Sequence, residues 1–159
     1  MKNFNKALNY AFLLLKYRAR SKHEIVSRLK EKGYAPAIRE RVVVCLEENN
    51  YIDDKKFVHL FTSHSLDKGW GPIRIDFNLK KLGISSQLRK QVLSGNFSFS
   101  DKVKEIIEEK LEYYQKVKPF ASMPKIWQKI IMHLVRKGFD LALINQEIDN
   151  LGEKGFENE

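Results

Sequence analysis

Basic side chains gather at two corresponding places in the first two thirds of the sequence, where they could hold phosphate groups or an acidic protein surface. Arginine suits both partners because its planar guanidinium makes paired hydrogen bonds with carboxylates and phosphates. The candidate contact residues are Arg18, Arg20, Lys22, Arg28, Arg74, Lys80, Lys81 and Arg89. We expect Arg18, Arg20 and Arg74 to lie on the surface near helix starts or junctions, where a cation gains little from the helix dipole, so these three are the strongest candidates.

A second role is open for the lysines that precede glycines. Lys30, Lys32, Lys80 and Lys81 stand just before Gly33 or Gly83. At the end of a helix each lysine would stabilise the helix dipole by about 0.3 to 1 kcal/mol without any partner. For these lysines the dipole role and the contact role both stay open.

The net charge of the chain is +9, and the positive charge is unevenly spread. Basic residues outnumber acidic ones by 11 to 5 in residues 1–52 and by 8 to 4 in residues 53–99. Residues 100–159 hold 10 basic and 11 acidic residues. We therefore expect the positive field to lie in the first two thirds of the chain, and the last third to contribute less to binding.

One sequence pattern occurs three times, around Gly33, Gly83 and Gly138. Isoleucine stands eight residues before each glycine and leucine four residues before it. These residues are Ile25, Ile75 and Ile130, then Leu29, Leu79 and Leu134. Because residues four apart lie on one face of a helix, the pattern predicts three helices with a buried face. Each glycine predicts the helix end, where glycine adopts the left-handed conformation at little cost.

Start signals complete the predicted elements. Ser21 with Glu24 forms a capping box, and Pro72 and Pro124 stand at first helical positions. Another helix should follow each glycine turn, and an amphipathic stretch precedes each pair, at residues 4–17, 54–67 and 101–117. The chain is therefore expected to be all-α, with about nine helices in an elongated tandem array.

The array has three three-helix units, at residues 1–52, 53–99 and 100–159, and the last unit carries an acidic tail. A single unit of about 50 residues buries too little surface to be comfortably stable alone. Stacked neighbours can share a core, as in other helical repeat proteins.

Several classes of site are not expected. Cys45 is the only cysteine, so we predict no disulfide and no thiolate metal cluster. The histidines show no metal-ligand spacing, and we expect solvated or incidental roles for them; they are His23, His59, His64 and His133. Motifs for phosphate binding, nucleophilic catalysis and zinc hydrolysis are missing from the sequence. We therefore expect a binding protein that is not an enzyme and uses no cofactor. No apolar run is long enough to cross a membrane, and this absence and the single cysteine both fit a cytoplasmic location.

Three segments together carry a family resemblance: "RARSKHEIVSRLKEKGY", "YIDDKKF" and "GWGPIRIDFNLKKLGIS". Their order and spacing resemble those of the RecX family, the regulators of bacterial RecA recombinase. The similarity runs from about residue 7 to about residue 151. The resemblance implies a monomer of three tandem three-helix units that binds the RecA filament on single-stranded DNA. It also implies inhibition of ATP hydrolysis, strand exchange and coprotease activity, with effects on DNA repair and the SOS response.

Direct DNA binding is the alternative, because two helices joined by a short turn also describe a helix-turn-helix. The candidate recognition helices disfavour it. Residues 36–48 contain "VVVCL", which must largely be buried, and residues 140–151 contain no lysine or arginine. Reading base edges requires exposed Arg, Lys, Asn or Gln. Trp70, between two glycines, could stack on a base or anchor a partner, although a packing role between two units is the simpler interpretation.

Overall fold

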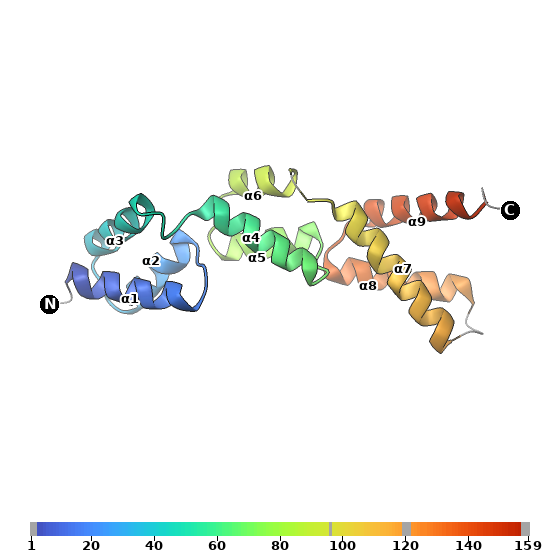
Figure 1. Cartoon of the computed structure of the whole chain (residues 1–159), viewed down its shortest axis with the longest axis horizontal. Helices are drawn as coiled ribbons and strands as arrows, with labels where there is room; N and C mark the ends of the chain where they lie inside the picture. The colour runs from blue at the N-terminus through green and yellow to red at the C-terminus, as the bar shows by residue number, and fades with distance from the viewer. Residues whose placement is uncertain (1–2, 96, 119–121, 157–159) are drawn as a thin grey trace. The chain divides into compact units, whose positions relative to one another are not determined.

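The computed structural model describes residues 3–95, 97–118 and 122–156, and these residues form nine α-helices and no strand (Figure 1). The helices are α1 (Phe4–Tyr17), α2 (Lys22–Glu31), α3 (Pro36–Glu48), α4 (Asp54–Asp67), α5 (Pro72–Lys81), α6 (Ser86–Leu93), α7 (Phe99–Val117), α8 (Met123–Lys137) and α9 (Leu141–Phe156). The prediction of an all-α chain with about nine helices is confirmed. No helix in this part of the chain has the length and apolar character needed to span a membrane.

The helices gather into two compact units. Unit 1 comprises Met1–Phe61 with Asn78–Val92, and unit 2 comprises Thr62–Phe77 with Leu93–Glu159. Helices α1 to α3 belong to unit 1 and α7 to α9 belong to unit 2, whereas α4 and α5 each contribute residues to both. The boundaries of the three sequence repeats, at residues 52/53 and 99/100, stay predictions.

Each unit has its own apolar core. The core of unit 1 is built from Ala7, Ala11, Ile25, Leu29, Val42, Leu46 and Ile52. The core of unit 2 is built from Val103, Ile106, Ile107, Ile126, Ile130, Leu134, Phe139 and Ile144. All six equivalent isoleucines and leucines of the sequence pattern have no exposed surface. The helix faces predicted from the spacing of four residues are therefore confirmed.

The three glycine turns have one geometry. Gly33, Gly83 and Gly138 have positive φ angles of 76°, 76° and 92°. The residue after each glycine donates its backbone N–H to the carbonyl of the pattern's leucine. These bonds join Tyr34 to Leu29, Ile84 to Leu79 and Phe139 to Leu134, each with an N···O distance of 3.1 Å. The glycine itself donates to the carbonyl three residues back, which completes a Schellman motif and satisfies carbonyls that have no partner inside the helix.

The start of a second helix packs on a glycine turn from the next part of the chain, once in each unit. In unit 1 the Ser21 hydroxyl donates to the carbonyl of Leu82 at 2.6 Å. In unit 2 the Gly71 backbone N–H donates to the carbonyl of Lys137 at 2.8 Å. Leu82 and Lys137 are the residues immediately before Gly83 and Gly138, and Ser21 and Gly71 both lie twelve residues before their own pattern glycine. The same contact between a helix start and a glycine turn, which we call the seat, thus occurs once in each unit.

The seat leaves no room for a side chain on its glycine. A Cβ on Gly83 would collide with the His23 side chain, and a Cβ on Gly138 would lie 2.7 Å from the backbone nitrogen of Arg74. Close approach of two backbones therefore requires glycine at 138 in addition to its positive φ.

We expect Gly138→Ala to destabilise unit 2 by about 3 kcal/mol or more, because a strained φ and a backbone clash act together. Gly33→Ala is the matched control, since Gly33 has a similar φ but is exposed. Strain alone should cost the control about 1 to 2 kcal/mol.

Denaturant unfolding followed by tryptophan fluorescence and by circular dichroism measures both variants. Trp70 and Trp127, the two tryptophans of the chain, lie in unit 2, so their fluorescence reports on that unit. Equal destabilisation of the two variants would contradict the close backbone approach at Gly138.

Candidate partner-binding surface

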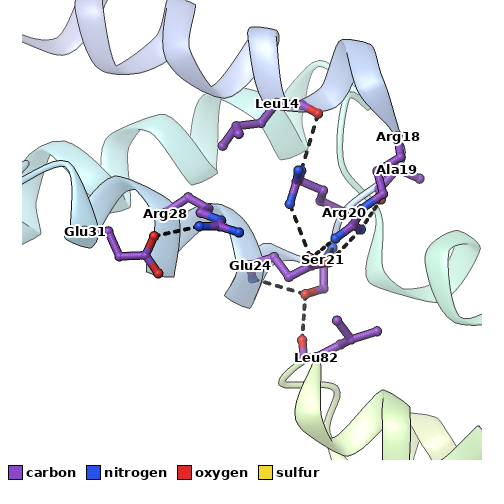
Figure 2. Close-up of polar contacts among 9 residues, drawn as sticks. All are labelled: Leu14, Arg18, Ala19, Arg20, Ser21, Glu24, Arg28, Glu31 and Leu82. Carbon is purple, nitrogen blue, oxygen red and sulfur yellow. Dashed lines mark hydrogen bonds and ion pairs between the residues drawn. The ribbon is translucent and has the colours of Figure 1, made fainter.

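The start of α2 carries a cluster of charged side chains around Glu24 (Figure 2). Glu24 completes the predicted capping box, since its Oε2 accepts the backbone N–H of Ser21 at 3.2 Å while the Ser21 hydroxyl accepts the backbone N–H of Glu24. The same carboxylate forms an ion pair with Arg18 and a second one, at 3.4 Å, with Arg20. A negative charge in the first turn also favours the helix dipole. One acid therefore compensates two arginines, and the cluster keeps a surplus positive charge.

Arg20 does not lie on the surface, and our expectation that it does is wrong. Its side chain is only 12% exposed. The Nε group donates at 3.3 Å to the carbonyl of Leu14, one of the last four carbonyls of α1, which lack partners inside the helix. Burial lowers the pKa of the Arg20 guanidinium below its usual value, and the nearby charge of Arg18 lowers it further. Arg20 joins the end of α1 to the start of α2.

Arg18, Lys22 and Arg28 are accessible but paired. The side chains of Arg18 and Arg28 are each 51% exposed, and Arg28 pairs with Glu31 at 2.9 Å on its own helix. Lys22 forms an ion pair with Glu47 of α3, and this hydrogen bond raises the pKa of the ammonium group. An external anion would have to share these cations with acids of the same unit.

The backbone of Lys22 reveals a contact that the sequence did not indicate. Its N–H donates at 2.9 Å to Oδ1 of Asp54, at the start of α4. Asp53 accepts from the N–H groups of Lys55 and Lys56 at the start of the same helix. Both aspartates cap helix starts: Asp53 caps α4, whereas Asp54 accepts from the start of α2.

Arg74 occupies the second basic position, in the first turn of α5. Its guanidinium carbon lies 4.3 Å from the centre of the Trp70 ring, within the range of a cation–π contact. Arg74 is exposed and Trp70 is half-buried. Because the Arg74 backbone also faces Gly138, this residue forms part of the seat in unit 2 as well as of the surface.

Three further candidates lie around the turn between α5 and α6. Lys80 and Lys81 are exposed in the last turn of α5, where a cation favours the helix dipole. Arg89 is half-buried and donates to the carbonyl of Ile84 at 2.6 Å.

Unit 1 thus contains seven of the eight candidates, and Arg74 belongs to unit 2. Among the described residues, no group of three or more His, Cys, Asp or Glu side chains could hold a metal ion. What the arrangement offers is exposed cationic surface for an acidic protein or a phosphate chain.

Comparison with known proteins gives relatives along nearly the whole chain. A family model described as "RecX, first three-helix domain" matches residues 7–44. The regulatory protein RecX of Bacillus licheniformis is 36% identical over 99% of this chain and 59% of its own length. The protein of the same name from Bacillus subtilis is 31% identical over 94% of this chain and 55% of its own length. The chain therefore spans somewhat more than half the length of these Bacillus relatives.

Solved structures agree in fold. The crystal structure of RecX from Lactobacillus salivarius matches with a TM-score of 0.81 and 22% identity, over 94% of this chain and 96% of that one. A second crystal structure, of a regulatory protein RecX, matches with a TM-score of 0.72 over 92% of this chain and 71% of that one. At 22% and 21% identity, these likenesses show a shared fold.

The different environments of Arg18 and Arg20 predict different effects on stability. Arg20→Ala should lower the free energy of unfolding by about 1.5 to 3 kcal/mol, because it removes a mostly buried charged hydrogen bond to a helix end. Arg18→Ala should cost less than about 1 kcal/mol, since an exposed ion pair contributes little and Glu24 keeps its bond to Arg20. Denaturant unfolding followed by circular dichroism tests both, and an equal cost would contradict the structural role of Arg20.

Proposed function

Because the chain belongs to the RecX family, we propose that it regulates RecA recombinase by binding the RecA filament on single-stranded DNA. Binding would inhibit the ATPase, strand-exchange and coprotease activities of RecA, and would thereby affect DNA repair and the SOS response. The observation that carries this proposal is the 36% identity to a regulatory protein RecX over 99% of the chain. The regulator would act in the cytoplasm as a monomer, by binding and without catalysing a reaction.

The charged cluster of unit 1 supports a role in binding an acidic partner. Arg18 is half-exposed and shares Glu24 with Arg20. When Arg18 turns to an external carboxylate or phosphate, Glu24 still has Arg20 as its partner. No buried charge is left uncompensated by this movement, so the cost that normally follows from breaking an ion pair is avoided.

The alternative, a helix-turn-helix that reads DNA directly, has less support. Helix α3 buries Val42 and Leu46 against the core of unit 1. Its first turn consists of Pro36, Ala37 and Ile38, which offer no side-chain groups for base edges. The first turn of α9 consists of Leu141, Ala142 and Leu143, and it likewise offers no side-chain groups for base edges.

Charge reversal at exposed positions of unit 1 tests the proposal. The variant Arg18→Glu, Arg28→Glu, Lys80→Glu should bind the filament at least about tenfold more weakly, because three attractive interactions become repulsive. It should also relieve inhibition of DNA-dependent ATP hydrolysis by RecA. The dependence of binding on salt should become less steep by about one unit for each phosphate group that the variant no longer neutralises.

A matched control reverses the same number of charges in the last third of the chain. Lys102, Lys104 and Lys116 each pair with a glutamate of their own helix, α7. Their reversal to glutamate should change filament binding by less than about threefold. Circular dichroism checks that both variants fold. Equally weakened binding in the two variants would show that net charge alone, and not the surface of unit 1, determines affinity.

A further inference from the structure

A cleft in unit 2 lies between α7 and α8 and has a volume of about 460 Å³. Four of the side chains that line it are cations: Lys110, Lys118, Lys129 and Arg136. No acidic side chain belongs to the lining. The volume lies within the range of sites that bind small ligands, roughly 300 to 1,000 Å³.

Acidic side chains of α7 form ion pairs with lysines that do not line the cleft. Three glutamates of α7 pair with lysines three or four residues away on the same helix. These pairs are Glu105 with Lys102 at 2.7 Å, Glu108 with Lys104 at 3.9 Å and Glu112 with Lys116 at 2.6 Å. None of these six residues lines the cleft. Within the part of the chain that the structure describes, only Glu109, 3.8 Å from Lys110, pairs with a cation of the cleft. The expectation that positive surface is confined to the first two thirds of the chain is therefore wrong here.

Tyrosine rings stand beside the cations. Tyr113 is 53% exposed, and its ring centre lies 5.4 Å from that of the half-buried Tyr114. The ammonium group of Lys110 lies 5.9 Å from the Tyr113 ring centre, and that of Lys129 lies 5.7 Å from the Tyr114 ring centre. An exposed aromatic ring next to cations is the arrangement that binds a planar base and its phosphate together.

We propose that the cleft between α7 and α8 binds a nucleotide, with its phosphates held by Lys118, Lys129 and Arg136 and its base stacked on Tyr113. Among the described residues, no ion pair occupies these three cations. Base and phosphate are shared by single-stranded DNA and by a free nucleoside triphosphate, so either could be the source. The site belongs to this chain alone and does not depend on binding to a RecA filament.

The pKa of His133 reflects the positive charge of the cleft. Burial lowers the pKa of its imidazole below the usual value, and the cations Lys110, Lys137 and Arg136 lower it further, whereas Glu109 opposes them. His133 is thus half-buried, and the expectation of a solvated or incidental role stays a prediction. A depressed pKa keeps His133 neutral at pH 7, and a bound phosphate should raise that pKa by favouring the charged form.

The experiment uses the full chain without RecA. Fluorescence anisotropy measures binding of a labelled oligothymidylate, and unlabelled ATP and inorganic tripolyphosphate serve as competitors. The variant Lys129→Ala, Arg136→Ala should bind the oligonucleotide at least about tenfold more weakly, and its salt dependence should be less steep by about 1.4 units. The control Lys104→Ala, Lys116→Ala removes the same charge outside the cleft and should weaken binding by less than about twofold.

The variant Tyr113→Leu distinguishes a site that binds nucleotides from a site that binds any polyanion. This variant should bind the oligonucleotide and ATP about tenfold more weakly, within the measured range of base stacking, and keep its affinity for tripolyphosphate. Titration of His133 by NMR should show its pKa rising when the wild type is saturated with the ligand that binds best. Tryptophan fluorescence checks that unit 2 remains folded in each variant.

Preference for the oligonucleotide over ATP would assign the site to single-stranded nucleic acid, and the reverse preference would assign it to a free nucleotide; either result supports the proposal. Three results would overturn it: no binding of either ligand at millimolar concentration, equally weakened binding in the cleft variant and its control, or full nucleotide affinity in Tyr113→Leu.

Discussion

The seating of one helix start on a glycine turn is the interaction on which the rest of the structure depends. A helix of 10 residues such as α5 ends with carbonyls that have no partner inside the helix. One of them, at Leu82, is satisfied by the Ser21 hydroxyl, and the corresponding carbonyl at Lys137 is satisfied by the Gly71 backbone. Because this packing needs bare backbone on one side, the glycine that ends the helix also makes the seat. A single residue type therefore ends one helix and provides the surface on which the start of another helix packs.

Helix positions could be predicted from the sequence because the signals that determine them are local. The expected helices at residues 4–17 and 54–67 have the bounds of α1 and α4 in the structure. Capping side chains, prolines and glycines act within a few residues, and the burial of every fourth residue follows from the helix period. The partner of Ser21 could not be predicted in this way. Leu82 lies 61 residues further along the chain, and only the packing of α2 on the turn after α5 brings the two together.

The distribution of charged residues along the sequence predicted only part of the exposed basic surface. Arg18 and Arg20 are near neighbours of the same type, yet their side chains are 51% and 12% exposed. The difference arises because Arg20 points to the free carbonyls at the end of α1, whose position relative to α2 the sequence does not show. The count for residues 100–159 was misleading for another reason. Ion pairs along α7 cancel the acids locally, which leaves Lys129 and Arg136 of α8 without that compensation. Their spacing of seven residues, with His133 between them, places all three on one face of α8 and could have indicated the cleft.

The two proposed binding regions belong to different compact units, and this has a consequence for affinity. In our proposals, exposed arginine and lysine side chains of unit 1 bind an acidic protein surface, and the cleft of unit 2 binds a base and its phosphate. If both proposals hold, a partner that contains both protein and single-stranded nucleic acid presents a ligand for each unit. The second binding event is then intramolecular and takes place at a high effective concentration, so two weak sites yield strong binding to the composite partner. Isolated protein or isolated nucleic acid engages only one region and is bound weakly. On the proposed function, binding to both components would let the chain distinguish an assembled filament from its separate parts.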